Sequence, residues 1–344
     1  MDSEQLHETA KALVAVGKGI LAADESSATI EKRFDAIGVE STEENRRAYR
    51  DLLFTTDGAE DYISGVILFD ETIRQSTEDG TPFPKALEQR AVIPGIKVDK
   101  GAKALALAPD ETVTEGLDGL RERLEEYREL GARFAKWRAV LSIEVDQIPS
   151  DYAIWTNAHA LARYAALAQE AGLVPIVEPE VLMDGDHTLD RAYSVTSRTL
   201  QAVFTELYDQ RVDFEGMLLK PNMVLPGYDA AEQVSDDEIA RATIKCFKRT
   251  VPAAVPGIVF LSGGQSDEDA TARLNAMNAL AEKLPWQLSF SYGRALQAAA
   301  QKAWSGKAEN REAAQRAFYH RAKMNSAART GAYAPEMERE AVTA

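Results

Sequence analysis

Short apolar segments alternate along this chain with longer segments in which apolar and charged positions recur at helical spacing. The apolar segments are rich in β-branched residues and are bounded by turn residues, so they predict buried β-strands. The eight predicted strands are 20–24, 65–69, 94–99, 134–141, 174–181, 217–224, 257–264 and 288–293. Their starts lie 29 to 45 residues apart, which leaves room for one crossover helix between successive parallel strands.

The segments between these strands predict helices, and Ser266 or Asp267 is positioned to cap one of them. The predicted helices are 117–130, 150–171, 189–208, 235–249, 267–284 and 309–325, with an alanine-rich helix at 295–303. Strands that alternate with helices predict an α/β fold whose parallel sheet is covered on both faces. Eight strands can close on themselves, so we expect a (β/α)8 TIM barrel, with an open doubly wound sheet as the alternative. We expect a single domain over 1–344, with a short N-terminal helix and a C-terminal helical tail.

Composition narrows the classes of function. The chain has 39 Lys and Arg against 55 Asp and Glu, a formal charge of −16, which disfavours binding to nucleic acid or to an anionic membrane. The single cysteine, Cys246, allows no internal disulfide. With no apolar run of membrane-spanning length and no signal-peptide pattern at the start, we expect a cytoplasmic protein.

Metal and nucleotide sites are not indicated by the sequence. The four histidines, His7, His159, His187 and His320, do not share the helix or strand spacing that a catalytic zinc site requires. Neither a Walker-A nor a GxGxxG pattern occurs. We therefore expect no metal and no cofactor.

Ionisable residues interrupt or end several predicted strands, where an unpaired charge would be costly to bury. They are Asp24, Lys97, Asp99, Lys100, Lys136, Arg138, Glu178, Glu180, Lys220 and Arg294. In an α/β barrel the carboxyl ends of the strands form the active-site face. Alternation along a strand places Lys136 and Arg138 on one face and Glu178 and Glu180 on one face of the next strand, so we expect these opposite charges to meet in one cavity. Lys97 and Asp70, by contrast, fit a solvated strand end.

Lys220 is the residue in this set that most directly indicates chemistry. It lies in an apolar strand just before Pro221, where desolvation and a second cation, Lys136, both favour a neutral amine. A neutral lysine amine attacks ketones to form a Schiff base. The alternative is a structural ion pair with Glu178 or Glu180. That carboxylate pair could also serve as acid and base, and a glycosidase would use two carboxylates as well, but it would leave the buried lysines unexplained.

Glycine-bearing segments follow the last two predicted strands. Ser262 and Gly263 lie in one, and Ser291, Gly293 and Arg294 lie in the other. Glycine turns and helix N-termini offer backbone N–H groups to phosphate, and many barrels bind phosphate after strands seven and eight. Such turns also end strands for steric reasons alone, but the two together favour a phosphate site.

Eight segments of this sequence, in order, resemble the class I fructose-bisphosphate aldolases, and the similarity extends over about residues 17–333. The segments are 17–26 (GKGILAADES), 42–47 (TEENRR), 96–101 (IKVDKG), 134–138 (FAKWR), 175–180 (PIVEPE), 218–224 (LLKPNMV), 260–266 (FLSGGQS) and 289–297 (SFSYGRALQ). The resemblance implies a TIM barrel, metal-independent cleavage of fructose 1,6-bisphosphate and a homotetramer.

The resemblance also implies a role for each candidate residue. Lys220 would form the Schiff base, Glu178 would move protons while it forms, and Asp24 would accept the C4 hydroxyl proton, with Lys136 and Glu180 supporting the charge around that centre. The C1 phosphate would lie at Ser262, Gly263, Gly293 and Arg294, and the C6 phosphate at Ser26, Thr29, Arg33 and Lys100. Arg138 and Ser291 complete the expected substrate-binding set.

Two departures from the family pattern stand out. Ala28 and Thr29 stand where animal aldolases carry Gly and Ser, which puts phosphate affinity in doubt. The segment 340–344 lacks the terminal tyrosine that assists enamine protonation in the animal enzymes, so we expect slower or differently catalysed protonation. Another Schiff-base aldolase or transaldolase, and a non-catalytic aldolase-like scaffold, are the alternatives. Preference between fructose 1,6-bisphosphate and fructose 1-phosphate is not predicted.

Overall fold

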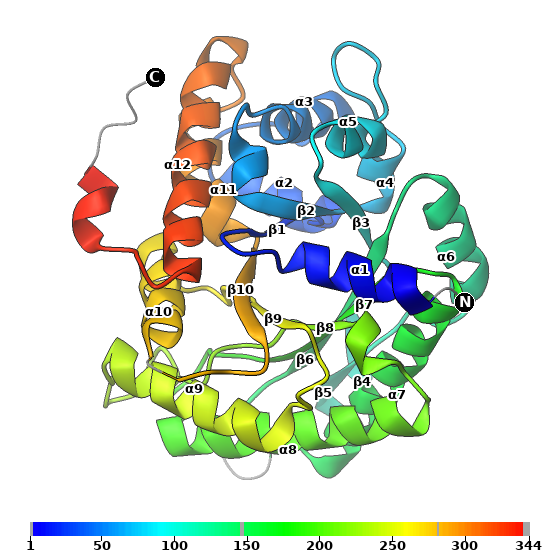
Figure 1. Ribbon diagram of the computed structural model, residues 1–344, viewed down its shortest axis with the longest axis vertical. Coiled ribbons are helices and arrows are strands. Elements are labelled where there is room, and N and C mark those ends of the chain that lie inside the picture. Colours follow the sequence, from blue (N-terminus) through cyan, green and yellow to red (C-terminus); the bar gives the residue numbers. More distant parts are fainter. Residues whose placement is uncertain (1–2, 145–147, 281, 340–344) are drawn as a thin grey trace.

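A closed barrel of parallel strands forms the centre of the molecule (Figure 1). The computed structural model describes residues 3–144, 148–280 and 282–339. The barrel strands, in spatial order, are β1 (Gly19–Ala22), β10 (Gln287–Tyr292), β9 (Gly257–Phe260), β8 (Leu218–Leu219), β7 (Val174–Val181), β6 (Phe134–Leu141), β3 (Ile93–Lys97) and β2 (Ile63–Leu68). Because Ile20 of β1 pairs with Ser291 of β10 as well as with Gly65 of β2, the sheet has no open edge. The predicted TIM barrel is confirmed, and the open sheet is excluded.

Helices surround the barrel and fill most of the connections between strands (Figure 1). They are α1 (Ser3–Leu13), α2 (Ser27–Asp35), α3 (Glu43–Phe54), α4 (Asp70–Ile73), α5 (Phe83–Gln89), α6 (Leu120–Glu129), α7 (Asp151–Glu170), α8 (Leu189–Asp209), α9 (Asp236–Thr250), α10 (Asp267–Ala279), α11 (Arg294–Trp304) and α12 (Arg311–Arg329), with 3-10 turns η1 (Ala59–Asp61), η2 (Phe214–Gly216), η3 (Ala308–Asn310) and η4 (Pro335–Arg339). Of the two predicted caps for α10, Ser266 is the one observed, since its side chain accepts from the Asp269 amide.

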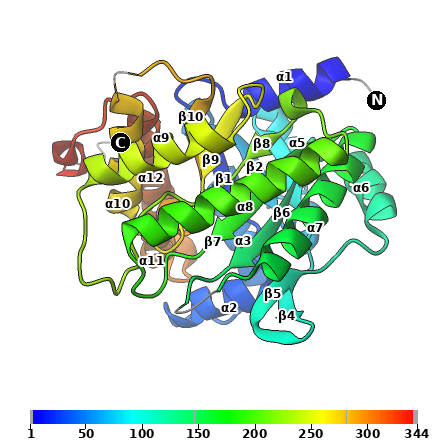
Figure 2. The ribbon, with the colours of Figure 1, turned by 90° about the horizontal axis from the view of Figure 1, so that it is seen from below.

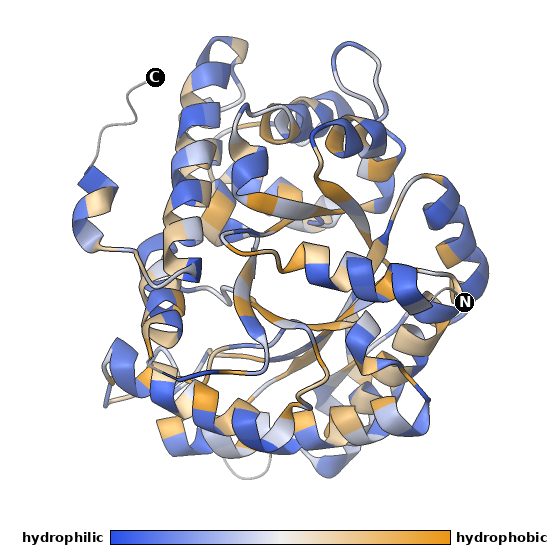
Figure 3. Ribbon diagram, in the orientation of Figure 1, coloured by the Kyte–Doolittle hydropathy of each residue, from blue (hydrophilic) through white to orange (hydrophobic). Residues whose placement is uncertain are grey.

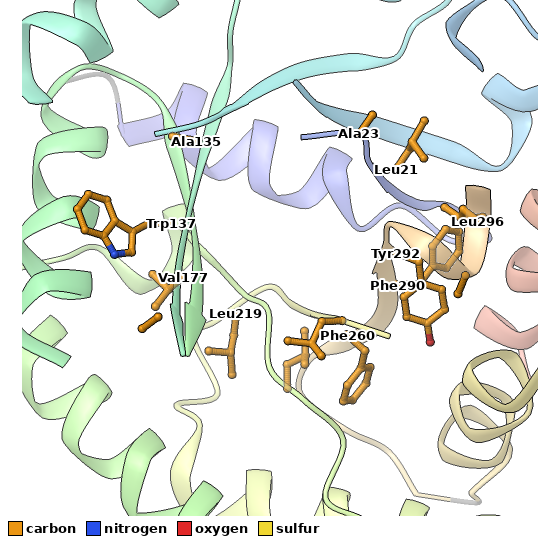
Figure 4. Packing of buried hydrophobic residues seen from close by; sticks show 14 of the residues in the cluster. Leu21, Ala23, Ala135, Trp137, Val177, Leu219, Phe260, Phe290, Tyr292 and Leu296 are labelled. Carbon is orange, nitrogen blue, oxygen red and sulfur yellow. The ribbon is translucent and has the colours of Figure 1, made fainter. Parts of the chain in front are cut away.

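Two apolar layers stabilise this arrangement. The larger one lies between the strands and the helices, and Figure 4 shows its strand side through residues such as Trp137, Val177 and Phe260. Hydrophobic colour is concentrated on the strands in Figure 3, whereas the helices are mixed, as expected of helices that bury one face. Burial of apolar area on both faces of the sheet is the main source of stability in this fold.

The second apolar layer fills the barrel interior and extends to α1. Leu6, Ala10, Leu13 and Val14 of this N-terminal segment belong to the same buried cluster as Phe134 and other inward strand side chains. Gly257 lets the segment approach closely, because a Cβ at this position would lie 2.5 Å from Val14 Cγ1. The segment α1 therefore closes the amino-terminal end of the barrel. Figure 2 shows α1 at one end and α2 at the opposite end, so the carboxyl ends of the strands remain open for a site.

Strands β6 and β7 have the predicted bounds, but β8 and β9 are shorter than predicted. Strand β8 stops after Leu219 because Pro221 has no N–H to donate to a neighbour. The chain nevertheless stays beside its neighbours, since the Lys220 amide donates to Val177 and the Leu261 amide donates to the Pro221 carbonyl. Strand β9 ends at Phe260, ahead of Gly263 and Gly264, whose φ angles are both positive.

The sequence interpretation missed an antiparallel hairpin, β4 (Ala102–Leu105) and β5 (Ala108–Thr114), which Figure 2 shows at the same end as α2. It also placed some helix ends wrongly. Helix α6 begins at Leu120 rather than at residue 117, because Gly119 takes a left-handed conformation. Helix α10 ends at Ala279, whereas 284 was predicted, and α12 continues to Arg329 beyond the predicted 325.

The closure of the barrel by α1 can be tested with Leu13→Ala. Leu13 is fully buried, so the substitution should lower the free energy of unfolding by about 2–5 kcal/mol through lost burial and an unfilled cavity. Urea unfolding would measure this change. Val16→Ala is the matched control, because Val16 is 77% exposed and should change stability by less than about 0.5 kcal/mol. Equal effects of the two substitutions would contradict the proposed closure.

Candidate active site

A cavity of about 970 Å³ opens at the carboxyl ends of the barrel strands. Strands β1, β6, β7 and β10 and the segments that follow β3, β8 and β9 all contribute to its wall. Every residue that the sequence nominated for the site lines this cavity: Asp24, Ser26, Thr29, Arg33, Lys100, Lys136, Arg138, Glu178, Glu180, Lys220, Ser262, Gly263, Ser291, Gly293 and Arg294. The fold therefore brings together residues that are separated by as many as 270 positions in the chain (294 − 24).

Four buried charges form a connected chain in the depth of this cavity. Lys136 Nζ lies 2.7 Å from Asp24 Oδ2 and 3.2 Å from Glu178 Oε2. Lys220 Nζ lies 3.2 Å from Glu178 Oε1. Glu178 thus bridges the two lysines, with one oxygen toward each. All four side chains are almost entirely removed from solvent, so each charge depends on the others for compensation.

The pKa shifts of Asp24 and Lys136 reflect this mutual dependence. Burial by itself would raise the pKa of the Asp24 carboxyl, but the nearby Lys136 and Lys220 ammonium groups outweigh it and hold that pKa well below its usual range. Burial would likewise lower the pKa of Lys136, but the Asp24 and Glu178 carboxylates raise it well above its ordinary value. Asp24 is therefore anionic and Lys136 cationic throughout the physiological pH range.

The strand register explains why these charges meet. Strands β6 and β7 run in parallel with Arg138 opposite Glu178 and Val140 opposite Glu180. A side chain that leans along its strand then reaches the carboxylate on the neighbouring strand, and Arg138 pairs with Glu180 just as Lys136 pairs with Glu178. The predicted meeting of basic and acidic residues from these two strands in one cavity is confirmed.

One part of the cavity wall offers hydrogen-bond donors without partners. Among the described residues, the amide N–H groups of Gly263 and Gly264 donate no hydrogen bond, and the buried Ser291 hydroxyl has no partner. Arg294 stands at the first position of α11 and approaches Gly264, with Nη2 3.3 Å from where a Cβ of that glycine would lie. Unpaired donors beside a guanidinium and a helix N-terminus are suited to bind a phosphate.

A second group of polar side chains lines the cavity at the start of α2. Ser26 and Thr29 lie 3.0 Å apart through their hydroxyl oxygens, so the Thr29 methyl group does not prevent its hydroxyl from facing its neighbour. Arg33, further along α2, pairs with the buried carboxylate of Glu25. Glu25 also pairs with Arg50 at 2.5 Å and accepts a hydrogen bond from Gln297. These contacts fix the carboxylate that pairs with Arg33 and therefore hold the Arg33 guanidinium in place.

Several cavity residues were not nominated as site residues. Lys97 was interpreted as a solvated strand end, but its side chain is only 15% exposed, pairs with Asp99 at 2.6 Å and lines the cavity. Asp70 is half-exposed at the rim, as expected, and accepts from the Tyr127 hydroxyl. Arg74, Arg123, Glu126, Tyr127 and Asp184 also line the cavity. They precede or follow predicted strands by several residues, and no local signal in the sequence marks them.

Metal-binding clusters and membrane-spanning helices are both absent from the described residues. Within 3–144, 148–280 and 282–339, no group of three or more His, Cys, Asp or Glu side chains is arranged to hold a metal ion. No helix in those ranges has the length and apolar character needed to cross a membrane. The tail 340–344, for which slower enamine protonation was expected, lies outside the described residues. Tyr333, just before it, donates to Glu338.

Comparison with known proteins agrees with the geometry. A family model described as "Fructose-bisphosphate aldolase class-I" matches residues 5–344. The chain belongs to the class I fructose-bisphosphate aldolases. This confirms the resemblance, the fold class and the prediction of an aldolase, and it removes transaldolase from the alternatives.

Two curated aldolases and one solved aldolase structure illustrate the similarity. The "Probable fructose-bisphosphate aldolase class 1" of Xylella fastidiosa (strain 9a5c) is 62% identical over 332 residues, or 96% of this chain and 99% of that one. "Fructose-bisphosphate aldolase 6, cytosolic" of Arabidopsis thaliana is 57% identical, over 96% of this chain and 92% of the relative. The aldolase of Plasmodium falciparum, solved in complex with TRAP and a small molecule inhibitor, superposes with a TM-score of 0.95 at 50% identity, covering 96% of each chain.

The dependence of Asp24 and Glu178 on Lys136 can be tested in this aldolase with Lys136→Met. The substitution leaves two buried carboxylates without their shared cation, which should lower the free energy of unfolding by about 3–5 kcal/mol at pH 7. Because the folded-state pKa of Asp24 lies below its ordinary value of 3.8, its contribution is present above that pH and is lost as the pH falls further. Urea unfolding at pH 7, 4 and 2.5 should therefore show a difference from wild type that persists down to about pH 4 and shrinks below it.

Lys32→Met is the matched control, because Lys32 is exposed on α2 and lines no part of the cavity. It should leave stability within about 0.5 kcal/mol of wild type at every pH. A stability difference for Lys136→Met that stayed constant from pH 7 to 2.5 would show that the lost interaction is packing rather than charge.

Proposed function

We propose that the chain cleaves fructose 1,6-bisphosphate reversibly to dihydroxyacetone phosphate and glyceraldehyde 3-phosphate through a Schiff base on Lys220. The bridging position of Glu178 between Lys136 and Lys220 is the observation that carries this proposal. It gives one cavity a lysine held as a cation, a second lysine beside a carboxylate, and an aspartate held as an anion. These are the groups that a metal-free aldol cleavage requires.

The different surroundings of the two lysines favour Lys220 as the nucleophile. Lys136 pairs with two carboxylates, Asp24 and Glu178, which raise its pKa and keep it an ammonium. Among the residues that the structure describes, Lys220 pairs with Glu178 alone, in a neighbourhood of apolar strand residues. Transfer of a proton from Lys220 to Glu178 would leave a neutral amine to attack the C2 ketone, and that proton could then assist the departure of water from the carbinolamine.

Bond cleavage follows from the resulting iminium. The positive nitrogen on Lys220 withdraws the electrons of the C3–C4 bond, while Asp24 accepts the C4 hydroxyl proton. Its lowered pKa keeps Asp24 in the accepting form but makes it a weak base, so proton transfer has to accompany cleavage of the bond. Lys136 and the Arg138–Glu180 pair balance the charge that shifts during this step.

The two groups of polar residues fit a substrate with two phosphates. In this proposal the Gly263–Gly264 turn, Ser262, Ser291, Gly293 and Arg294 bind the C1 phosphate. Ser26, Thr29, Arg33 and Lys100 bind the C6 phosphate. Holding both ends positions C2 at Lys220 and the C4 hydroxyl at Asp24, so binding energy is used for orientation.

We also propose where the protein is located and how it is assembled. We infer a cytoplasmic location, supported by the relative named cytosolic, a single domain, and a homotetramer by analogy with the family. No observation in the cavity favours a different reaction. A non-catalytic scaffold is tested by the same experiment as the proposed chemistry.

Borohydride trapping tests the covalent mechanism. Incubation with dihydroxyacetone phosphate followed by reduction should leave a stable adduct, and peptide mass spectrometry should place it on Lys220. Lys220→Met should abolish both the adduct and cleavage while Lys136→Met retains some adduct. An adduct on Lys136, or appreciable cleavage by Lys220→Met, would refute the assignment. No adduct on folded wild-type protein would favour the scaffold.

Arg33→Gln tests the assignment of the C6 phosphate. Loss of one charge-assisted contact should lower kcat/KM for fructose 1,6-bisphosphate by about 10- to 100-fold, because Arg33 lines the cavity and Glu25 holds its guanidinium there. Cleavage of fructose 1-phosphate, which lacks that phosphate, should change little. Steady-state kinetics with both substrates would decide, and an equal loss for the two would place Arg33 elsewhere in the mechanism.

A further inference from the structure

Tyr228, in the segment between β8 and α9, contacts the glycine turn that follows β9. Its hydroxyl donates to the Gly263 carbonyl over 3.0 Å and lies 3.4 Å from Met183 Sδ. Its ring lies over the next residue of the turn, with Cε2 3.5 Å from where a Cβ of Gly264 would lie. The sequence interpretation gave Tyr228 no role, and the mechanism above does not use it.

Backbone contacts hold Tyr228 in place from the other side. Three consecutive amides, those of Gly227, Tyr228 and Asp229, donate to the carbonyls of His187, Met183 and Gly185 in the segment after β7, over 2.8–3.0 Å. The two segments are in such close contact that a Cβ on Gly227 would lie 2.1 Å from the Gly185 oxygen. Only glycine fits at that position, so the backbone of Tyr228 is anchored independently of its side chain.

The turn that Tyr228 contacts is closed by one backbone hydrogen bond, from the Gln265 amide to the Ser262 carbonyl over 3.0 Å, and this bond does not involve the peptide between Gly263 and Gly264. Gly263 and Gly264 have φ angles of 55° and 96°, in the left-handed region, and glycine gains more conformational freedom than any other residue when it is not held. Met183 packs on one side of the turn, since a Cβ on Gly263 would lie 2.6 Å from Met183 Cε. Within the described residues, the hydrogen bond from Tyr228 is the one that fixes the Gly263 carbonyl.

Fixing that carbonyl also fixes a donor. In a trans peptide the C=O of one residue and the N–H of the next point in opposite directions. The hydroxyl of Tyr228 therefore sets the direction of the Gly264 N–H, which has no hydrogen-bond partner in the described part of the chain and belongs to a residue of the cavity wall. Burial raises the pKa of Tyr228 to about 12, despite the opposing charge of Arg273, so the hydroxyl stays protonated and able to donate at physiological pH.

We propose that Tyr228 is a positioning residue for the phosphate at the Gly263–Gly264 turn, and that it determines affinity for that end of the substrate without touching the reacting atoms. This inference rests on the proposed function, because the ligand it names is the C1 phosphate of a ketose phosphate. Tyr228 acts through the peptide between Gly263 and Gly264 and leaves Lys220, Glu178 and Asp24 unaffected.

Tyr228→Phe tests the proposal, because it removes the hydroxyl and keeps the ring over Gly264. We expect the Kd for dihydroxyacetone phosphate and the KM for fructose 1,6-bisphosphate to rise by about fivefold, the size of one neutral hydrogen bond. The kcat should stay within about twofold, and the Kd for glyceraldehyde 3-phosphate should not change, because its phosphate binds at the other end. Tyr228→Ala, which also removes the ring, should raise the Kd for dihydroxyacetone phosphate further.

Tyr62→Phe is the matched control, since the Tyr62 hydroxyl contacts Tyr319 and lines no part of the cavity. This variant should have the wild-type Kd for both triose phosphates and the wild-type KM for fructose 1,6-bisphosphate. Thermal unfolding would establish that each variant is folded. An unchanged Kd for dihydroxyacetone phosphate in Tyr228→Phe would overturn the proposal, whatever the effect of Tyr228→Ala, and so would an equal loss for both triose phosphates or a fall in kcat alone. If wild-type protein forms no borohydride adduct, the proposed function fails instead, which separates the two failures.

Discussion

The buried carboxylate of Glu178 is the interaction on which the site depends. It lies 3.2 Å from each of two lysines whose side chains are almost fully buried and would otherwise repel each other. Removing it would leave Lys220 without the carboxylate that it pairs with, and Lys136 with only one of its two paired carboxylates, Asp24. Buried ion pairs contribute little net stability, because desolvation offsets their attraction. The cluster of Glu178, Asp24 and the two lysines therefore serves the chemistry rather than the stability of the protein, and the rest of the fold has to stabilise it.

The apolar layers supply that stability. Burial on both faces of the barrel strands, together with the closure of the amino-terminal end by α1, concentrates hydrophobic contacts away from the charges. The carboxyl ends of the strands are then not needed for apolar packing and can carry ionisable side chains. This separation explains how one strand, β6, can bury Phe134 in the barrel interior and present Lys136 to the cavity two residues later.

Much of this arrangement could be predicted from sequence because it follows from local periodicity. The bounds of β6 and β7 were predicted correctly since both strands are long, apolar and bounded by turns. Alternation along these two strands was enough to predict that their opposite charges meet in one cavity, but not which residues pair. Strand β8 was overestimated because Pro221 and Asn222 interrupt the ladder while the chain stays extended, and periodicity does not distinguish these cases. The β4–β5 hairpin was missed because its short, only partly buried strands give a weak apolar signal.

Contacts between loops were beyond sequence reasoning for a different physical reason. Lys97 was interpreted as a solvated strand end, but its side chain is only 15% exposed and lines the cavity together with residues that are distant in sequence, such as Lys136. Tyr228 likewise gains its partners from residues 183 and 263, about 45 and 35 positions away. Such contacts depend on where each loop leaves the barrel, which a periodic pattern does not encode. A TIM barrel can therefore keep its reacting centre on the strands while loop residues adjust the affinity for each end of a substrate, and in our proposal the Tyr228 hydroxyl, aimed at one glycine peptide, makes such an adjustment.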